Sequence, residues 1–463
     1  MENCVQAYLQ KKGYRVNTEA LQKIRSCDDW YANRLIPEFH KRHTVQNVAY
    51  DLLQLNFAKR CCSDDANLCE ILEINPGSKE QYDFVNEVLD ASEFQTQYRK
   101  QLEKTSADGT VACYVRLDKA TIMKSGKVQG GQIRLNYVEA ECFVPLTVEN
   151  DIVTEAAFSG SGLEKGKKMT TLVLFTREEN GLYTAETAYF DERGNELKDR
   201  TVTLTLGDVK PFAVMRNAEV NNLDNMEGYG LPKLYNAIPI LKVLDLCFNV
   251  LFGDLDKADK LILINEILCK FDDNGRPVTP NEQVKKLFVL LGEKLPQEKA
   301  LYQEYNPEIR VEQITKTFEL ALSLLSMMFG YGTKKYSFED GQIKTATEYA
   351  GERQDMLQEL NRQRQEAARY IQDIVRAVLW FANTFQGGSW DIGAEVNVEF
   401  DDSYITNKEA ELEQMRSDAV SFSDIPIFRV KYIMERLNCD EKQARAYLAE
   451  GQTDPDAGEE PED

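Results

Sequence analysis

The sequence predicts an α+β fold, and three observations support this prediction. Apolar residues recur at three- and four-residue spacing over roughly the first 105 residues, as in amphipathic helices. From about residue 108 to 217 the apolar spacing changes to two, which is typical of half-buried antiparallel strands. A third region, opening with ATEYAGERQ at residue 346, reads as a helix of almost forty residues. Helical and sheet segments are therefore segregated along the chain, as in α+β proteins.

Composition and charge narrow the class of protein. The 463 residues are enough for two to four domains. The formal net charge is -22, and the last eleven residues contribute six acids and no base, which leaves -16 on the rest. So acidic a chain does not hold nucleic acid by bulk attraction, although it is compatible with a protein that keeps DNA at a distance.

The cysteines and the apolar windows predict a soluble cytoplasmic product. The ten cysteines are scattered without CxxC pairs, which favours free thiols in a reducing compartment. The N-terminus MENCVQAYLQKKGYRV lacks an apolar signal core. The most apolar window, 237–252, is interrupted by Lys242 and Asp245 and is too short to span a bilayer.

The first half of the chain divides into a helical part and a sheet part. NTEALQKIRSCDDWYANRL and VQNVAYDLLQLNFAKRCC have the helical period. The predicted strands are VACYVRL, IRLNYVEA, CFVPLTV, TTLVLFTRE, LYTAETAYF and TVTLTL. The turn signals KSGK, GSGLEKGKK, EENG and DERGNE separate them, which predicts an antiparallel region.

Helices dominate the second half. Gly228 and Gly230 precede Pro232, which suits the first turn of a helix, and Pro239 is expected to kink or restart that helix. LILINEIL and KLFVLLGE are predicted strands around the loop DDNGRPVTPN, and another helix follows at about 311–328. The long helix should span about 55–60 Å, and its polar middle favours a role in bridging parts of the structure or packing on neighbouring chains. AEVNVEFDD is a predicted strand, two or three short helices run through Leu448, and the acidic tail should be disordered.

The sequence gives only weak evidence for a catalytic or metal site. GSGLEKGKKMT at 160–170 has the wrong glycine spacing for a phosphate-binding loop and leads into a strand, so it predicts a hairpin turn. The two histidines, His40 and His43, could be grouped with Cys61, Cys62 and Cys69, but no recognised ligand spacing is present. Nothing near the histidines resembles a nucleophile elbow. We therefore expect no enzyme, no metal site and no cofactor.

The loop GYGTKKYSFEDGQIKTATE, directly before the long helix, is more informative. It carries Lys334, Lys335 and Lys344, with glycines at Gly330, Gly332 and Gly341. A solvated turn is the plain interpretation of the spacing alone. The sequence of a helix, a glycine-rich loop and a very long helix in an acidic protein favours a functional loop. Tyr331, Tyr336 and Phe338 are expected to anchor the loop against helices rather than to stack on bases.

Several segments resemble the portal proteins of tailed bacteriophages, in one order along nearly the whole chain. DWYANRLIPEFHKRH with LNFAKRCCSDDANL resembles the N-terminal signature of that family, and VEAECFVPLTVENDIVTEAAF with LYTAETAYFDERGNE resembles its β-rich wing. PFAVMRNAEVNNLDNMEGYGLPKLYNAIPILKVLD resembles the entry to the first stem helix. The most specific segment, YNPEIRVEQITKTFELALSLLSMMFGYGTKKYSFEDGQIKTATE, resembles the second stem helix, the tunnel loop and the start of the long helix.

The resemblance implies a domain plan. It is a portal fold with a helical stem, a β-rich wing, a small clip and a C-terminal helical crown, assembled as a ring. The wing would be 1–230, with its antiparallel region from about 108, and the first stem helix 231–258. The other implied segments are the clip 259–311, the second stem helix 312–329, the tunnel loop 330–345, the long helix 346–390, the strand and crown 391–449, and the disordered tail 450–463.

The resemblance also implies a function and partners. Portal subunits form a ring, usually of twelve, at one capsid vertex of the virion, through which double-stranded DNA is packaged and ejected without sequence readout. Implied partners are the terminase, head-completion or connector proteins, and the major capsid and scaffolding proteins, with synthesis in the host bacterial cytoplasm and no membrane. Lys334, Lys335 and Lys344 would touch DNA, and Gly330, Gly332 and Gly341 would act as hinges. The alternatives are an oligomeric scaffold or adaptor without a DNA channel, and a hydrolase with an unrecognised site.

Overall fold

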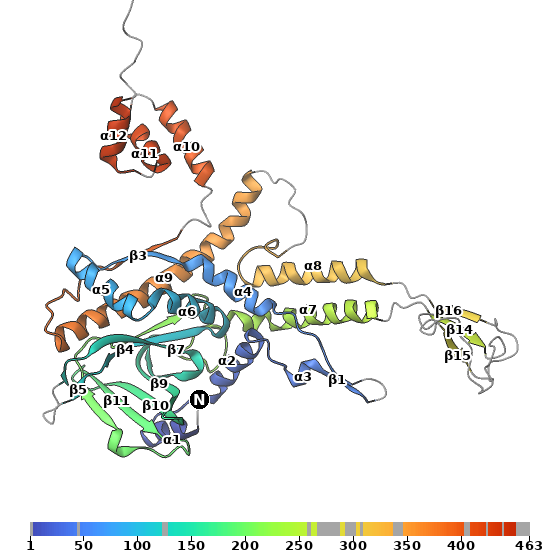
Figure 1. The fold of residues 1–463 in the computed structure, drawn as a ribbon, viewed down its shortest axis with the longest axis horizontal. Coiled ribbons are helices and arrows are strands. Elements are labelled where there is room, and N and C mark those ends of the chain that lie inside the picture. The colour runs from blue at the N-terminus through green and yellow to red at the C-terminus, as the bar shows by residue number, and fades with distance from the viewer. Residues whose placement is uncertain are drawn as a thin grey trace, which may run out of the picture. The chain divides into compact units, whose positions relative to one another are not determined.

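The computed structural model describes most of the chain and divides it into two compact units, residues 1–399 and 400–463. The described residues are 3–43, 47–122, 128–256, 261–265, 288–291, 302–305, 309–336, 346–401, 408–422, 425–437 and 439–450. Helices and antiparallel sheets are both present in the first unit, which confirms the α+β prediction (Figure 1).

The first hundred residues are mainly helical, as their periodicity predicts. The helices are α1 (Asn3–Lys11), α2 (Thr18–Tyr31), α3 (Pro37–His40), α4 (Phe57–Ala66), α5 (Lys79–Ala91) and α6 (Phe94–Asp108), with the 3₁₀ turn η1 (Asn67–Cys69). The Asn17 side chain caps α2 by accepting the Ala20 N–H at 3.0 Å. Three short strands, not predicted from the sequence, interrupt this part: β1 (Lys41–His43), β2 (Ala49–Asp51) and β3 (Ile71–Asn75). Strands of three to five residues are too short to give a reliable period-two signal.

Two antiparallel sheets follow. The larger has the order β12-β11-β10-β9-β8 and the smaller β13-β4-β7. The strands are β4 (Thr110–Asp118), β5 (Thr121–Ile122), β6 (Val128–Gln129), β7 (Gln132–Glu139), β8 (Phe143–Glu149), β9 (Ile152–Glu164), β10 (Lys167–Arg177), β11 (Tyr183–Phe190), β12 (Val202–Thr205) and β13 (Phe212–Arg216), with 3₁₀ turns η2 (Ala140–Cys142) and η3 (Lys198–Arg200). Buried rings join the sheets, with Tyr114 of β4 5.0 Å from Phe158 of β9 and Phe175 of β10 5.8 Å from Phe212 of β13.

The segment 160–170 forms a hairpin, as predicted. Strands β9 and β10 pair with the register Lys167↔Glu164, and Lys165 and Gly166 connect them. Both connecting residues have positive φ, 51° and 79°, which matches a two-residue type I′ turn. The residues that could suggest a phosphate-binding loop are therefore the turn of a hairpin.

Two helices form an antiparallel pair beside these elements. Helices α7 (Lys233–Asp256) and α8 (Val311–Met328) run side by side in Figure 1 and share a core with α2 and α4. Pro239 lies inside α7, and the helix continues through it, so the expected restart does not occur. Buried Leu234 and Ala237 before the proline and Leu241 and Leu244 after it pack into one cluster, which holds both parts in a single helix.

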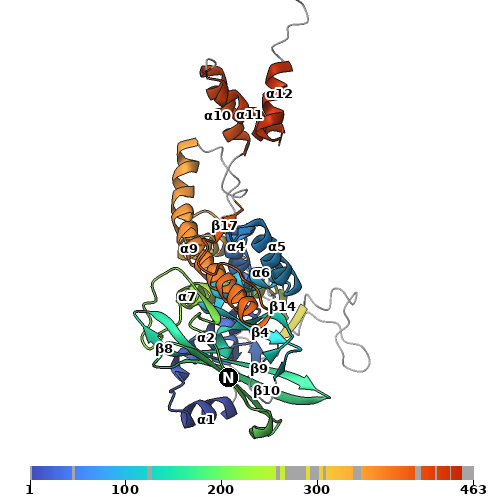
Figure 2. The same ribbon diagram turned by 90° about the vertical axis from the view of Figure 1, so that its left-hand side faces the viewer.

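The long helix predicted at 346 is α9 (Ala346–Phe385), with 40 residues. Its second half buries Tyr370, Ile371, Ile374, Val375 and Val378. In Figure 2 it lies over the sheets with α5 and α6 beside it, and it contacts β4 and β13. The remaining described strands are β14 (Leu261–Asn265), β15 (Phe288–Leu291) and β16 (Tyr302–Tyr305), in one sheet of order β15-β14-β16, and β17 (Asn397–Phe400), which ends the first unit and pairs with β3.

The second unit contains the predicted C-terminal helices. They are α10 (Lys408–Ser421), α11 (Pro426–Leu437) and α12 (Glu441–Glu450), and α11 contacts both of the others. The acidic tail at 450–463 lies, apart from Glu450, outside the described residues. Among the described helices, none has the length and apolarity required to cross a bilayer.

Candidate functional site

The loop singled out by the sequence begins where α8 ends, and the structure describes its first part. Lys334 and Lys335 are both exposed. Gly330 and Gly332 have positive φ, 75° and 71°, the backbone region in which glycine costs least. Gly341, Lys344 and Phe338 lie outside the described residues. The part of the predicted site that can be located is therefore residues 330–336, which we call the loop base.

A tight helix C-terminus forms the start of the loop base. Phe329 is fully buried after the last turn of α8, the Gly330 N–H donates to the Met327 carbonyl at 3.0 Å, and the Tyr331 N–H donates to the Ser326 carbonyl at 3.1 Å. These bonds satisfy carbonyls that a helix end would otherwise leave unpaired. A Cβ at Gly330 would stand 3.1 Å from Cγ of Glu359 on α9, so the turn also packs closely on the long helix.

Two tyrosines anchor the loop base to α4. The Tyr331 hydroxyl donates to Asp65 Oδ1 at 3.1 Å, and the Tyr336 hydroxyl donates to Asp64 Oδ2 at 3.3 Å. Their rings meet edge to face at 6.3 Å, and the Lys335 N–H donates to the buried Ser326 hydroxyl at 3.2 Å. The prediction that Tyr331 and Tyr336 anchor the loop is confirmed.

A buried lysine ties the anchored loop to the rest of the molecule. Lys233, the first residue of α7, is 3 % exposed, and its Nζ lies 3.0 Å from Asp65 Oδ1 and 3.2 Å from Glu359 Oε1. The first contact is a hydrogen bond, and the second is an ion pair without hydrogen-bond alignment at the glutamate oxygen. Asp65 thus receives both Lys233 and Tyr331, so one cluster joins α4, α7, the loop base and α9.

The protonation states in this cluster follow from its charges. Burial alone would lower the pKa of Lys233, but Asp65 and Glu359 outweigh it and raise that pKa, so the ammonium stays charged. Burial and the Asp65 carboxylate raise the pKa of Tyr331 far above its usual value, so its phenol remains a donor. Burial also raises the pKa of Glu219, and the nearby Lys233 opposes that shift.

Sequence reasoning did not single out Lys233 or its partners. A signal for Lys233 exists, because it is a lone cation on the helical face that also presents Leu234, Ala237, Leu241 and Leu244 to the core. No such signal exists for Asp65, which is 168 positions away in the chain.

The exposed lysines differ from Lys233 in their surroundings. Lys335 places its Nζ 5.6 Å from the centre of the Tyr331 ring, a cation–π distance, and keeps its side chain in solvent. The loop base therefore presents ammonium groups on a backbone that is fixed by buried contacts. Such groups can bind phosphate oxygens through charge, and phosphate contacts carry no sequence information. The assignment of Lys334, Lys335 and Lys344 to DNA contact, and of Gly330, Gly332 and Gly341 as hinges, stays a prediction.

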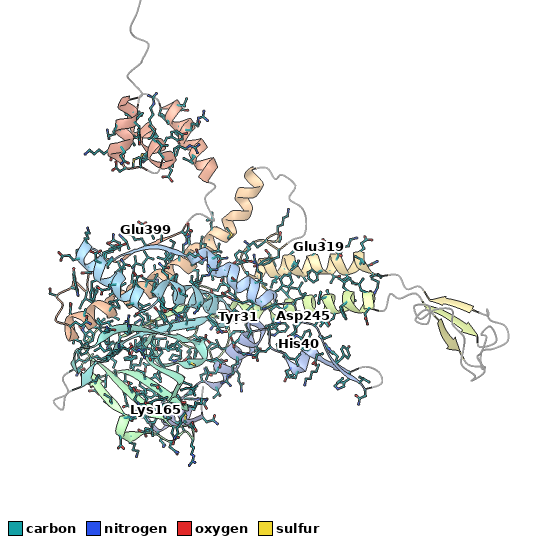
Figure 3. The ribbon with its side chains drawn as sticks, in the orientation of Figure 1. Tyr31, His40, Lys165, Asp245, Glu319 and Glu399 are labelled. Carbon is teal, nitrogen blue, oxygen red and sulfur yellow. The ribbon has the colours of Figure 1, made fainter. Side chains whose placement is uncertain are left out.

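The metal-site candidates from the sequence are the two histidines together with Cys61, Cys62 and Cys69. His40 is fully buried, and its Nε2 lies 3.2 Å from Asp245 Oδ2 on α7 (Figure 3). Within the described ranges, no three His, Cys, Asp or Glu side chains are grouped so that they could hold a metal ion. The nine described cysteines are free thiols, and Cys269 lies outside the described residues.

The α7–α8 pair also exposes apolar surface on the sides turned away from its core. On α8, Leu320, Leu324 and Met327 recur at helical spacing and are exposed, whereas Leu322 and Leu325 are buried. On α7 the exposed residues at helical spacing are Val243, Leu246 and Val250. We call these two sets the α8 stripe and the α7 stripe. A helix that is apolar on opposite faces is usually buried on both, so these stripes indicate a surface that another molecule covers.

Comparison with known proteins identifies a family. The family model described as "Phage portal protein, SPP1 Gp6-like" matches residues 11–421. Among solved structures, a chain described as "Neck of native GTA particle computed with C12 symmetry" is similar with a TM-score of 0.42 and 10% identity, over 81% of this chain and 89% of that chain. No curated protein matches the sequence.

Proposed function

Because the chain belongs to the SPP1 Gp6-like family of phage portal proteins, we propose that it forms a closed ring at one capsid vertex of a virion. Double-stranded DNA would pass through this ring during packaging and ejection. The ring is proposed to contain twelve copies and to bind the terminase, head-completion or connector proteins, and the major capsid and scaffolding proteins. Synthesis would take place in the host bacterial cytoplasm.

The observation that carries the ring is the pair of apolar stripes on α7 and α8. Leu320 is 62 % exposed and Leu324 40 % exposed, on the face opposite the core of their helix. Each leucine that becomes buried in an interface contributes about 1.5–3 kcal/mol. An interface that joins one face of a subunit to a different face of the next closes into a ring when the rotation between copies completes a turn.

The loop lysines would act on the DNA inside the ring. Duplex DNA carries one charge per about 1.7 Å of its axis, so a strongly basic channel would hold it along its length. The acidic chain, with a formal net charge of -22, would repel the backbone over a screening distance of about 8 Å. Lys334, Lys335 and Lys344, repeated around the ring, would then touch phosphates briefly while the duplex slides.

The chain's own part in this process would be structural. We propose that ATP hydrolysis belongs to the separate terminase, because the sequence has no phosphate-binding loop.

Two experiments test the proposal. Negative-stain images of the purified protein should show rings with a central hole. In a packaging assay, the triple variant Lys334→Ala, Lys335→Ala, Lys344→Ala should assemble normally and package at least tenfold less DNA. The matched control is Lys165→Ala, Lys167→Ala, Lys168→Ala, which removes three charges from the β9–β10 turn and should package normally. A protein that remains monomeric at all concentrations, or equal packaging by the two triple variants, would contradict the proposal.

A further inference from the structure

A short ribbon of two strands stands out because it has almost no core of its own. Strands β1 and β2 pair with the register Lys41↔Asp51, Arg42↔Tyr50 and His43↔Ala49, and all six residues are exposed. In Figure 1, β1 extends from α3 away from the sheets. An isolated two-stranded ribbon is marginally stable in water, so one of this length needs support from outside itself.

The root of the ribbon is fixed to α7 by two side chains that bind its backbone. Asn249 accepts the Leu53 N–H at 2.8 Å and donates to the Leu53 carbonyl at 2.7 Å. Asp245, four positions earlier and so on the same face of α7, accepts the Leu55 N–H at 2.7 Å. The segment that follows β2 therefore forms backbone hydrogen bonds with side chains of α7, much as a strand forms them with a neighbouring strand.

The segment that leads into β1 is fixed to the same part of α7. The Ile36 N–H donates to Nδ1 of His40 at 3.0 Å, so the ring proton is on Nε2, 3.2 Å from Asp245 Oδ2 (Figure 3). The Leu52 N–H donates to the His40 carbonyl at 2.9 Å, and both residues are buried. Asp245 thus holds both chains of the ribbon, which gives the exposed ribbon a base in which His40, Leu52 and Asp245 are buried.

The exposed apolar surface of the ribbon leads onto the α7 stripe. Tyr50 is 48 % exposed and Leu53 is 42 % exposed. Leu53 is bound to Asn249, which follows the stripe residue Leu246 by three positions and is its neighbour on the helix surface. The root of the ribbon and the α7 stripe are therefore neighbours on the surface of α7.

The charges favour a partner that is itself acidic. Strand β1 carries Lys41 and Arg42, which Asp51 on β2 offsets only in part, whereas the whole chain has a formal net charge of -22. A second copy of this chain therefore offers the opposite charge to the ribbon. The continuity with the α7 stripe, the surface proposed to join copies in the ring, points to the same occupant.

We propose that the β1–β2 ribbon is an arm that packs against the neighbouring copy of this chain and is held in position by Asp245 and Asn249. This inference rests on the proposed ring, and it adds a specific contact outside the stem helices. Because Asp245 and Asn249 belong to α7, they hold the arm in a fixed position relative to that helix. The arm and the helix pair α7–α8 therefore bind the neighbour as one surface.

A photo-crosslinking experiment tests this contact directly. A benzophenone amino acid replaces Tyr50, and the assembled protein is irradiated. The expected result is a covalent dimer whose crosslinked peptide belongs to the neighbouring copy, and its loss when the assembly is diluted to monomers before irradiation. Assemblies without crosslinks between copies would overturn the arm and leave the ring standing. A protein that never assembles would overturn both.

Two variants separate the side chains of the arm from its base. In Tyr50→Ser with Leu53→Ser, the Asn249 bonds remain, because they involve only the backbone of Leu53. We expect at least tenfold weaker association with an unchanged urea midpoint of the monomer. Asn249→Ala leaves Tyr50 and Leu53 in place and should also weaken association, because the arm loses its fixed position. Unchanged association in both variants would overturn the proposal.

Discussion

Two regions of the chain bury their apolar side chains to different extents. We call the β-rich region, residues 110–216, the wing and the pair of helices α7 and α8 the stem, as labels for these residues only. In the wing, Phe143, Phe158 and Phe212 are at most 1 % exposed, and they meet between two sheets. Among the side chains described in this region, the strongly exposed large apolar ones are Ile152 and Leu163, which lie at the β8–β9 and β9–β10 ends of the strands. The stem buries one face of each helix and exposes a second apolar face along most of the pair.

This difference indicates which part of the chain is complete by itself. A sheet sandwich closes its core within one chain, because two inner faces cover each other. The stem covers one apolar face of each helix within the chain, and the exposed apolar face has the character of an interface. Folding of a single copy should therefore depend on the wing and on the inner face of the stem, and assembly should depend on the outer face.

The largest effect is expected where the stem begins. Lys233→Met leaves the carboxylates of Asp65 and Glu359, whose side chains are 12 % and 13 % exposed, without their shared cation, and breaking such a contact costs roughly 3–5 kcal/mol. Urea denaturation of the monomer should show this loss in the free energy of unfolding. Lys335→Met, a nearby exposed cation, should change it by less than about 0.5 kcal/mol.

A second prediction follows for the same cluster. If the carboxylates cause the loss, then Asp65→Asn with Glu359→Gln should restore part of the stability of the Lys233→Met protein, because no buried charge remains. A Lys233→Met protein as stable as the wild type would show that the root of the stem does not depend on this cluster.

Substitutions on the outer face of the stem should change the unfolding free energy of the monomer less than Lys233→Met does. They should weaken assembly strongly. Leu320→Gln with Leu324→Gln keeps good helix formers and removes two exposed leucines from the α8 stripe. The stability of the monomer should change by less than about 1 kcal/mol. Each leucine buried in an interface contributes about 1.5–3 kcal/mol, so sedimentation velocity should show at least tenfold weaker association.

The wing offers a matched control for this result. Leu163 is 79 % exposed in the β9–β10 hairpin, more than either stem leucine. Leu163→Gln should leave the distribution of oligomers unchanged. Equal effects at the wing and the stem, or none at the stem, would remove the distinction between the two regions.

The sequence predicted the wing and the long helices well, for a physical reason. Strands of seven to eleven residues and a helix of 40 residues repeat their apolar period often enough to be recognised. The 13-residue strand β9 was not predicted, because its second half, GSGLE, carries turn residues rather than an apolar alternation. The three-residue strands β1 and β2 have no such repetition. Pro239 predicts a kink or a restart, and the packing on both sides of it keeps α7 one continuous helix. Lys334, Lys335 and Lys344 could be predicted as a group because they lie in one continuous loop that is rich in glycine and lysine. Lys233, Asp65 and Glu359 form one cluster only after folding, so no local pattern could connect them.

The smallest expected effect is a pH dependence at the start of the wing. Asp108 ends α6 just before β4, is 1 % exposed, and has one carboxylate oxygen without a hydrogen-bond partner. Burial, opposed by Lys104 and reinforced by Asp28 and Glu139, raises the pKa of Asp108 to about 7. The folded chain therefore keeps this proton at pH values where the unfolded chain, with an ordinary carboxyl pKa, has already lost it. Stability contributed by the protonated form is lost as pH rises toward and through 7.

Comparison of Asp108→Asn with the wild type isolates this group from others that titrate in the same range. Between pH 6 and pH 8 the wild type should lose about 1.4 kcal/mol of unfolding free energy relative to the variant, because one pKa unit corresponds to about 1.36 kcal/mol. Asp151→Asn, at a carboxylate whose side chain is 75% exposed, should show no such change relative to the wild type. A constant difference between Asp108→Asn and the wild type across this range would mean that the carboxylate is already ionised at pH 6. Water or Lys104 would then stabilise the buried carboxylate. In that case the core at the start of the wing would be more accessible to solvent than the comparison with the stem assumes.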